Sequence, residues 1–147
     1  MSNLYTYFAA PNDTEAAAIA DSVAGPVAGV HPIVDGVDPV VQGATLLSLI
    51  DGRDYENIVE DPEWARLVSS PAKDQEAWVV SMPDGFTTGL AEASEADLVK
   101  VADPWSKTEE FWGRATAEDL FPLLLELRAL ALSVRGTNAR LYCWISL

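Results

Sequence analysis

The sequence has very few of the residues that most often carry covalent chemistry, because its 147 residues include one cysteine and one histidine. A single cysteine, Cys143, excludes an internal disulfide, and its place in an apolar segment predicts a small core residue rather than a nucleophile. His31 has no second histidine with which to share a zinc ion, so we expect a loop or partly buried residue. The sequence therefore predicts neither a redox centre nor a zinc site.

Basic residues are also scarce. The chain has 9 lysines and arginines against 23 aspartates and glutamates, which gives a formal net charge of −14. A negative field of this size repels phosphate backbones and anionic membrane surfaces, so we expect the protein to bind neither nucleic acid nor membranes. It favours a basic protein as partner. The alternative is that the acidic residues only keep the protein in solution.

Long apolar runs and the common catalytic motifs are absent too. No uninterrupted apolar segment approaches the length that spans a membrane, and residues 1–5 have neither a basic segment nor the apolar run of a signal peptide. We therefore expect a cytoplasmic protein. The chain contains no G-x-S-x-G, no P-loop and no G-x-G-x-x-G, so the sequence predicts no catalytic residue and no cofactor. A binding protein is favoured over an enzyme.

What is present indicates one globular domain over residues 1–147, since 49% of the residues are hydrophobic and 22% are charged. The clearest signals lie in its last part. Residues 116–119 form a capping pattern, a nearly all-apolar helix follows, and Gly136 provides a left-handed exit. We expect Leu127 to be fully buried in this helix. The closing segment 140–147 is apolar at successive positions, which is typical of a strand covered on both faces.

That closing strand should present alternate residues to two layers. We expect one layer to contact Leu141, Cys143 and Ile145. Tyr142 and Trp144 should contact the other layer or a loop. A strand in this position belongs inside the sheet rather than at an exposed edge.

The rest of the chain shows shorter elements. Strands are expected at 4–10 and 76–82, and 27–37 is expected to be an extended loop or irregular edge strand. Helices are expected at 16–22, 40–50, 62–68 and 85–93, with further capping patterns at 94–97 and 106–109. This order predicts an α+β domain with a small sheet of about three strands covered by about five or six helices. The first and last strands are expected to be neighbours at its centre.

One acidic run between two expected helices invites a metal hypothesis. It comprises Asp51, Asp54, Glu56, Glu60 and Asp61. Hard cations bind several carboxylate oxygens, but the spacing here does not match a calcium-binding loop. The sequence therefore predicts a polar and acidic loop over residues 51–61 with room for one helical turn, and no metal site.

The densest mixture of aromatic and charged residues lies at 103–114. It contains Trp105, Glu109, Glu110, Trp112 and Arg114. Tryptophans beside paired carboxylates can line a pocket for a cation or a polar ring. The alternative is that the two tryptophans lie on one side of a short helix and pack it against the core, while both glutamates face the helix N-terminus.

A second candidate is a pair of arginines on the last helix. Arg128 and Arg135 are one heptad apart and should share a helix face, where they could hold a carboxylate or phosphate. The alternative is that both extend past apolar neighbours to acidic loops, with Arg135 favoured near the helix C-terminus.

Three groups of residues resemble a known family. They are the aromatic start 4–8, the segment 36–39 followed by 46–52, and the apolar last helix with its closing 141–145. In these segments the chain resembles the YfbM-like family of small bacterial proteins, which is classed as a domain of unknown function. The resemblance covers about half of the chain and implies a compact α/β-type domain. It implies no activity and no functional residue.

The sequence thus leads to two functional hypotheses. The preferred one is an acidic binding domain for a partner protein, for example a basic toxin that it neutralises. The alternative is a small-molecule-binding protein or enzyme with a pocket near Trp105 and Trp112. A flat apolar patch on an acidic face would favour the first hypothesis, and a concave pocket with converging polar groups would favour the second. The sequence predicts no oligomeric state.

Overall fold

An antiparallel sheet forms the middle layer of the structure, a computed structural model that describes residues 4–20, 25–26, 33–69 and 77–146. Within these ranges the sheet has five strands in the order β2-β1-β5-β4-β3. The strands are β1 (Leu4–Ala10), β2 (Ile33–Asp35), β3 (Arg66–Leu67), β4 (Ala77–Ser81) and β5 (Arg140–Ser146). The prediction of an α+β domain is confirmed, and the sheet is larger than predicted because of the short edge strands β2 and β3.

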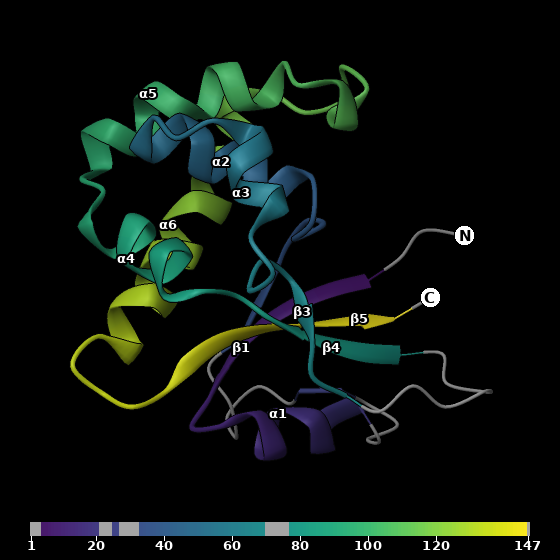
Figure 1. The fold of residues 1–147 in the computed structure, drawn as a ribbon. Helices are drawn as coiled ribbons and strands as arrows, with labels where there is room; N and C mark the ends of the chain where they lie inside the picture. Colours follow the sequence, from purple (N-terminus) through teal and green to yellow (C-terminus); the bar gives the residue numbers. More distant parts are fainter. Residues whose placement is uncertain (1–3, 21–24, 27–32, 70–76, 147) are drawn as a thin grey trace.

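Helices cover both faces of the sheet, one on one side and five on the other within the described ranges (Figure 1). The α-helices are α1 (Asp13–Ala20), α2 (Gln42–Asp51), α3 (Tyr55–Glu60), α4 (Asp84–Glu92), α5 (Glu95–Ser106) and α6 (Ala117–Val134), and a 3-10 helix, η1, spans Glu109–Phe111. Helix α1 lies alone beneath the sheet, and α2 to α6 lie above it. None of the described helices combines the length and the apolar character needed to span a membrane.

The closing strand β5 lies at the centre of the sheet, between β1 and β4, as predicted. Its side chains alternate between two buried clusters. Leu141, Cys143 and Ile145 join the large cluster on the side of α6, whereas Tyr142 and Trp144 join the smaller cluster beside α1. Both faces are buried because helices cover both sides. Cys143 is fully buried in the core, and this burial raises the pKa of its thiol, which disfavours the nucleophilic thiolate.

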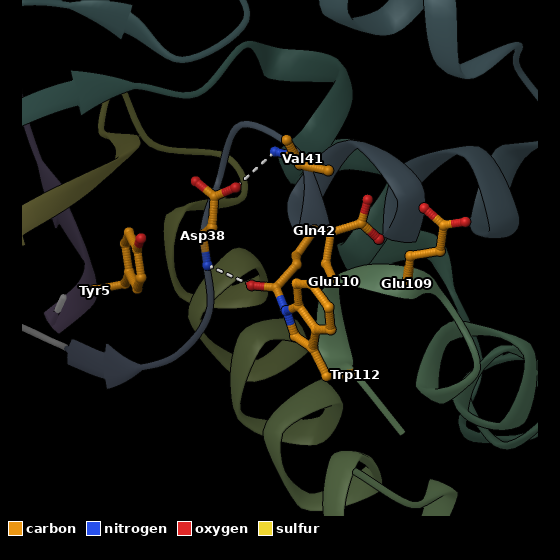
Figure 2. Close-up of a pocket in the computed structure, with 7 residues that line it drawn as sticks. All are labelled: Tyr5, Asp38, Val41, Gln42, Glu109, Glu110 and Trp112. Atoms are coloured by element: carbon orange, nitrogen blue, oxygen red, sulfur yellow. Dashed lines mark hydrogen bonds between the residues drawn. The ribbon is translucent and has the colours of Figure 1, made fainter. Parts of the chain in front are cut away.

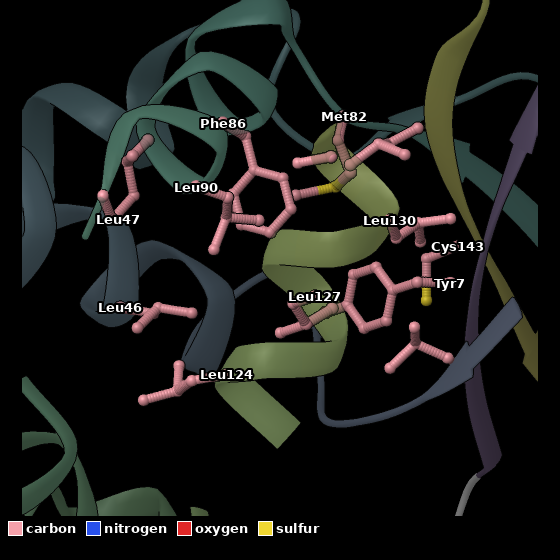
Figure 3. Close-up of a cluster of buried hydrophobic side chains, with 14 of the residues drawn as sticks. Tyr7, Leu46, Leu47, Met82, Phe86, Leu90, Leu124, Leu127, Leu130 and Cys143 are labelled. Carbon is pink, nitrogen blue, oxygen red and sulfur yellow. The ribbon is translucent and has the colours of Figure 1, made fainter. Parts of the chain in front are cut away.

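Helix α6 has the capped start and the glycine exit that the sequence predicts. The Thr116 hydroxyl accepts from the backbone N–H of Asp119 at 3.2 Å, and the Asp119 carboxylate accepts from the N–H of Thr116 at 3.1 Å, which is a capping box. Gly136 adopts a φ of +78° after the helix. Leu127 is 1% exposed and lies at the middle of the large cluster (Figure 3).

Helix α1 is fixed to the sheet by a polar contact at its first residue. The Asp13 carboxylate accepts from the Tyr142 hydroxyl at 2.8 Å and from the Arg66 guanidinium at 2.9 Å. The hydrogen bond from Arg66, followed by that from Tyr142, lowers the pKa of Asp13. One carboxylate therefore joins a helix, an edge strand and the central strand.

The prediction of a helix over residues 62–68 is wrong. Residues 62–65 form a turn in which Ala65 has a φ of +49°, and Arg66 and Leu67 form β3. Long-range contacts outweigh the local helix signal here, because Arg66 pairs with Ser81 of β4 and reaches Asp13. Trp64 in this turn contacts the segment before α2, since its indole N–H donates to the carbonyl of Val40 at 3.2 Å. The acidic loop before this turn contains the short helix α3.

Other predicted elements agree with the structure apart from small shifts. The segments expected at 4–10, 76–82, 85–93 and 94–97 give β1, β4, α4 and the capped start of α5. Parts of the elements expected at 16–22, 27–37, 76–82 and 140–147 lie outside the described residues, as does His31.

Candidate functional site

A pocket of about 560 Å³ opens where three distant parts of the chain meet. Its walls come from the start of β1, from the turn that leads into α2, and from η1 with the residue after it. The lining residues are Tyr5, Asp38, Val41, Gln42, Glu109, Glu110 and Trp112. Figure 2 shows Tyr5 on one side of Asp38 and Gln42, and Trp112, Glu110 and Glu109 on the other. We call this the Trp112 pocket.

The turn at residues 38–41 forms one wall. The two carboxylate oxygens of Asp38 accept from the backbone N–H groups of Val40 and Val41 at 3.1 and 2.9 Å. The side-chain oxygen of Gln42 accepts from the N–H of Asp38 at 3.0 Å. Helix α2 begins at Gln42 rather than at the predicted Val40, and residues 39–41 form the turn before it. These three hydrogen bonds fix the conformation of residues 38–42, which form this wall of the pocket.

Trp105 was predicted to line the site, and the structure places it behind the pocket instead. It is fully buried, and its indole N–H donates to the carbonyl of Gln42 at 3.0 Å. Its ring meets the Phe111 ring edge to face at 5.2 Å, and its carbonyl accepts from the N–H and hydroxyl of Thr108. Trp105 thus contacts both walls and is a positioning residue.

Trp112 forms the rim of the pocket. It is 83% exposed and has a φ of +54°, directly before Gly113 at +69°. Its backbone N–H donates to the carbonyl of Glu109 at 2.9 Å, which closes the single turn of η1. The interpretation that Trp105 and Trp112 share one side of a helix is therefore wrong. Helix α5 continues through Ser106, and the residue at the N-cap of η1 is Thr108 rather than Ser106.

The pocket is negatively charged. Glu109 is exposed and Glu110 is half-buried, and neither side chain forms a hydrogen bond or an ion pair with any residue that the structure describes. The pKa of the nearby Tyr55 phenol is raised, first by burial and then by the negative charges of Glu110 and Asp38. The negative charges of Glu110 and Asp38 therefore also act on Tyr55, which does not line the pocket.

The basic residues of this region do not neutralise the pocket. Lys107 pairs with Asp103 at 3.0 Å. Arg114, a predicted site residue, is exposed, does not line the pocket, and has no ion pair within the described ranges. Among the residues that the structure describes, the charged ones that line the Trp112 pocket, Asp38, Glu109 and Glu110, are all acidic.

The two arginines predicted as a second site lie elsewhere, Arg128 within α6 and Arg135 directly after it. Arg128 donates through Nε to the carbonyl of Ala93 at 2.7 Å. The guanidinium of Arg135 is 3.9 Å from the Glu92 carboxylate and lines a separate groove of about 410 Å³ between α4 and the end of α6. The structure does not bring them together around one anion.

Four lining residues were not predicted from the sequence, namely Tyr5, Asp38, Val41 and Gln42. The only local signal among them is the turn at Asp38 and Pro39, which indicates a helix start and carries no information about residues 109–112. No group of three or more metal-binding side chains is found in the ranges that the structure describes.

Comparison with known proteins finds no matching family, no matching curated protein and no matching solved structure. The resemblance to the YfbM-like family stays a prediction. The function must therefore be inferred from the site itself.

Proposed function

We propose that this chain is a binding domain for a basic protein partner, and that the Trp112 pocket is its main contact. The observation that carries this proposal is the conformation of Trp112. An L-residue in the left-handed region costs about 1–2 kcal/mol relative to its usual conformations, and large side chains are uncommon there. With 83% of its surface exposed, the indole recovers little of that cost by burial. A contact with another molecule accounts for a tryptophan at this position.

The charge of the pocket indicates what that molecule offers. Three carboxylates and an exposed indole face fit a cationic side chain, since an aromatic face attracts cations and carboxylates pair with them. The net charge of −14 adds long-range attraction for a basic protein. A basic toxin that the domain neutralises is one partner of this kind.

A protein fits the rim better than a small metabolite does. Trp112 and Glu109 are both exposed at the edge of the pocket, where a macromolecule can reach them. Tryptophan is enriched among the residues that dominate protein–protein interfaces. A concave pocket with polar groups is the feature expected of a small-molecule site, so a small organic cation is the second candidate ligand, and the exposed rim is what favours a protein.

A charge variant tests the proposal. The double variant Glu109→Gln/Glu110→Gln is expected to weaken binding of a fluorescent peptide of alternating lysine and arginine by about tenfold, because it removes the open carboxylates of the pocket. Fluorescence anisotropy at several salt concentrations measures the effect, and the affinity of the native protein should fall as salt rises.

The matched control is Glu95→Gln/Glu126→Gln, which removes the same charge from exposed positions that do not line the Trp112 pocket. It is expected to weaken binding only slightly. Equal losses in the two double variants would mean that the peptide responds to net charge alone, and the pocket would then not be the binding site.

A further inference from the structure

We infer that the Trp112 pocket receives an arginine of the partner in preference to a lysine, with the guanidinium lying between the Trp112 indole and the carboxylates of Glu109 and Glu110. This inference rests on the proposed function and specifies its ligand. Three features of the pocket support it.

The first feature concerns the hydrogen-bond acceptors of the pocket and the donors that they already have among the described residues. Both oxygens of Asp38 already accept from backbone N–H groups, and the side-chain oxygen of Gln42 accepts from the N–H of Asp38. Within the described part of the chain, Glu109 and Glu110 have no such donors. Glu109 and Glu110, which are neighbours in the sequence, therefore offer the acceptors with the fewest partners in the pocket. A guanidinium has five N–H donors in one plane and can bond both, whereas an ammonium is a compact charge with three donors.

The second feature is the indole at the rim. A planar guanidinium can stack on an aromatic face and is more weakly hydrated than an ammonium, so it loses less hydration when it enters such a site. A pocket of about 560 Å³ has room for a guanidinium together with its aliphatic stem.

The third feature is that no cationic side chain among the described residues lines the site. Two of the chain's nine cations, Lys107 and Arg114, lie within five residues of Glu109 or Glu110 in the sequence, and neither lines the pocket. Lys107 is bound to Asp103 instead. The like charges of Glu109, Glu110 and Asp38 are left for a cation from another molecule to compensate.

Three peptides with one neutral glycine-serine host sequence test the inference. Their central residue is arginine, lysine or citrulline, the last being an uncharged analogue of arginine. In NMR titrations the arginine peptide is expected to bind about tenfold more tightly than the lysine peptide, and citrulline should not bind measurably. The arginine preference should disappear in Trp112→Gly and shrink in Glu109→Gln/Glu110→Gln. Leu67→Ala, which removes an exposed apolar side chain outside the pocket, should preserve it.

The outcomes separate this inference from the proposed function. If lysine binds as tightly as arginine and Trp112→Gly weakens both, the arginine preference is wrong and the proposed function stands. If Trp112→Gly leaves the binding of every basic peptide unchanged, both are wrong. Equal binding of citrulline and arginine would show that charge plays no part, which also contradicts both.

Discussion

Leu127→Ala is expected to lower the free energy of unfolding by about 2–5 kcal/mol. Leu127 is 1% exposed and lies in the large cluster (Figure 3). This cluster also contains residues of α4, α5 and the sheet. The substitution removes apolar contacts and leaves a cavity, because closely packed neighbours relax only in part into the vacated space. Urea denaturation monitored by circular dichroism measures the change.

The same substitution at Leu132 provides the control, since this leucine lies on the same helix and is 37% exposed. Its cost should be clearly smaller, because little of a cavity forms at a site open to solvent. Equal losses at the two positions would mean that α6 does not separate a buried face from an exposed one, and the layered arrangement in Figure 1 would be wrong.

Trp112→Gly is expected to leave the protein equally stable or to stabilise it by up to about 1 kcal/mol, while it weakens binding of basic peptides by about tenfold or more. Glycine adopts the positive φ of this position without a steric cost, which raises the free energy of unfolding. The greater conformational freedom of glycine in the unfolded chain cancels part of this increase. Thermal denaturation measures the first effect and fluorescence anisotropy the second.

Trp105→Phe is the comparison variant, because it changes a buried tryptophan behind the pocket instead of the exposed one at its rim. It removes the indole donor to Gln42 from a fully buried position, so it should lower both stability and affinity. A Trp112→Gly variant that loses more than about 1 kcal/mol, with peptide affinity unchanged, would show that Trp112 serves the fold rather than a ligand.

The end of the chain could be predicted well because its signals are local and agree with one another. The capping box at Thr116, the apolar repeat of α6 and the doubly apolar β5 each indicate one structure, and the packing confirms all three. Leu127 and Cys143 are buried as predicted, because they lie on apolar faces of α6 and β5.

Local signals failed where contacts between distant residues decide the structure. Residues 62–68 carry a helix start, but pairing with β4 and the contact of Arg66 with Asp13 produce a turn and a strand. Trp105 and Trp112 have helical spacing, yet α5 ends between them and only one of them is buried.

The candidate site could be predicted only in part. The sequence indicated Glu109, Glu110 and Trp112, because aromatic and acidic residues are adjacent there. It did not indicate Tyr5 or Gln42, since no spacing rule connects the first strand, the start of α2 and η1. The charge of the Trp112 pocket therefore could not be predicted from any one segment, because only the tertiary fold places Asp38 beside residues 109–112.

One measurement tests the binding role of Trp112 most directly. Each indole N–H gives its own signal in a proton–nitrogen NMR spectrum, and the signal of Trp112 can be assigned from its absence in Trp112→Gly. On titration with the peptide of alternating lysine and arginine, the Trp112 signal is expected to shift. The signal of Trp144, which is buried in the cluster beside α1, should stay in place. An unchanged Trp112 signal at a peptide concentration that saturates binding would contradict the proposed function.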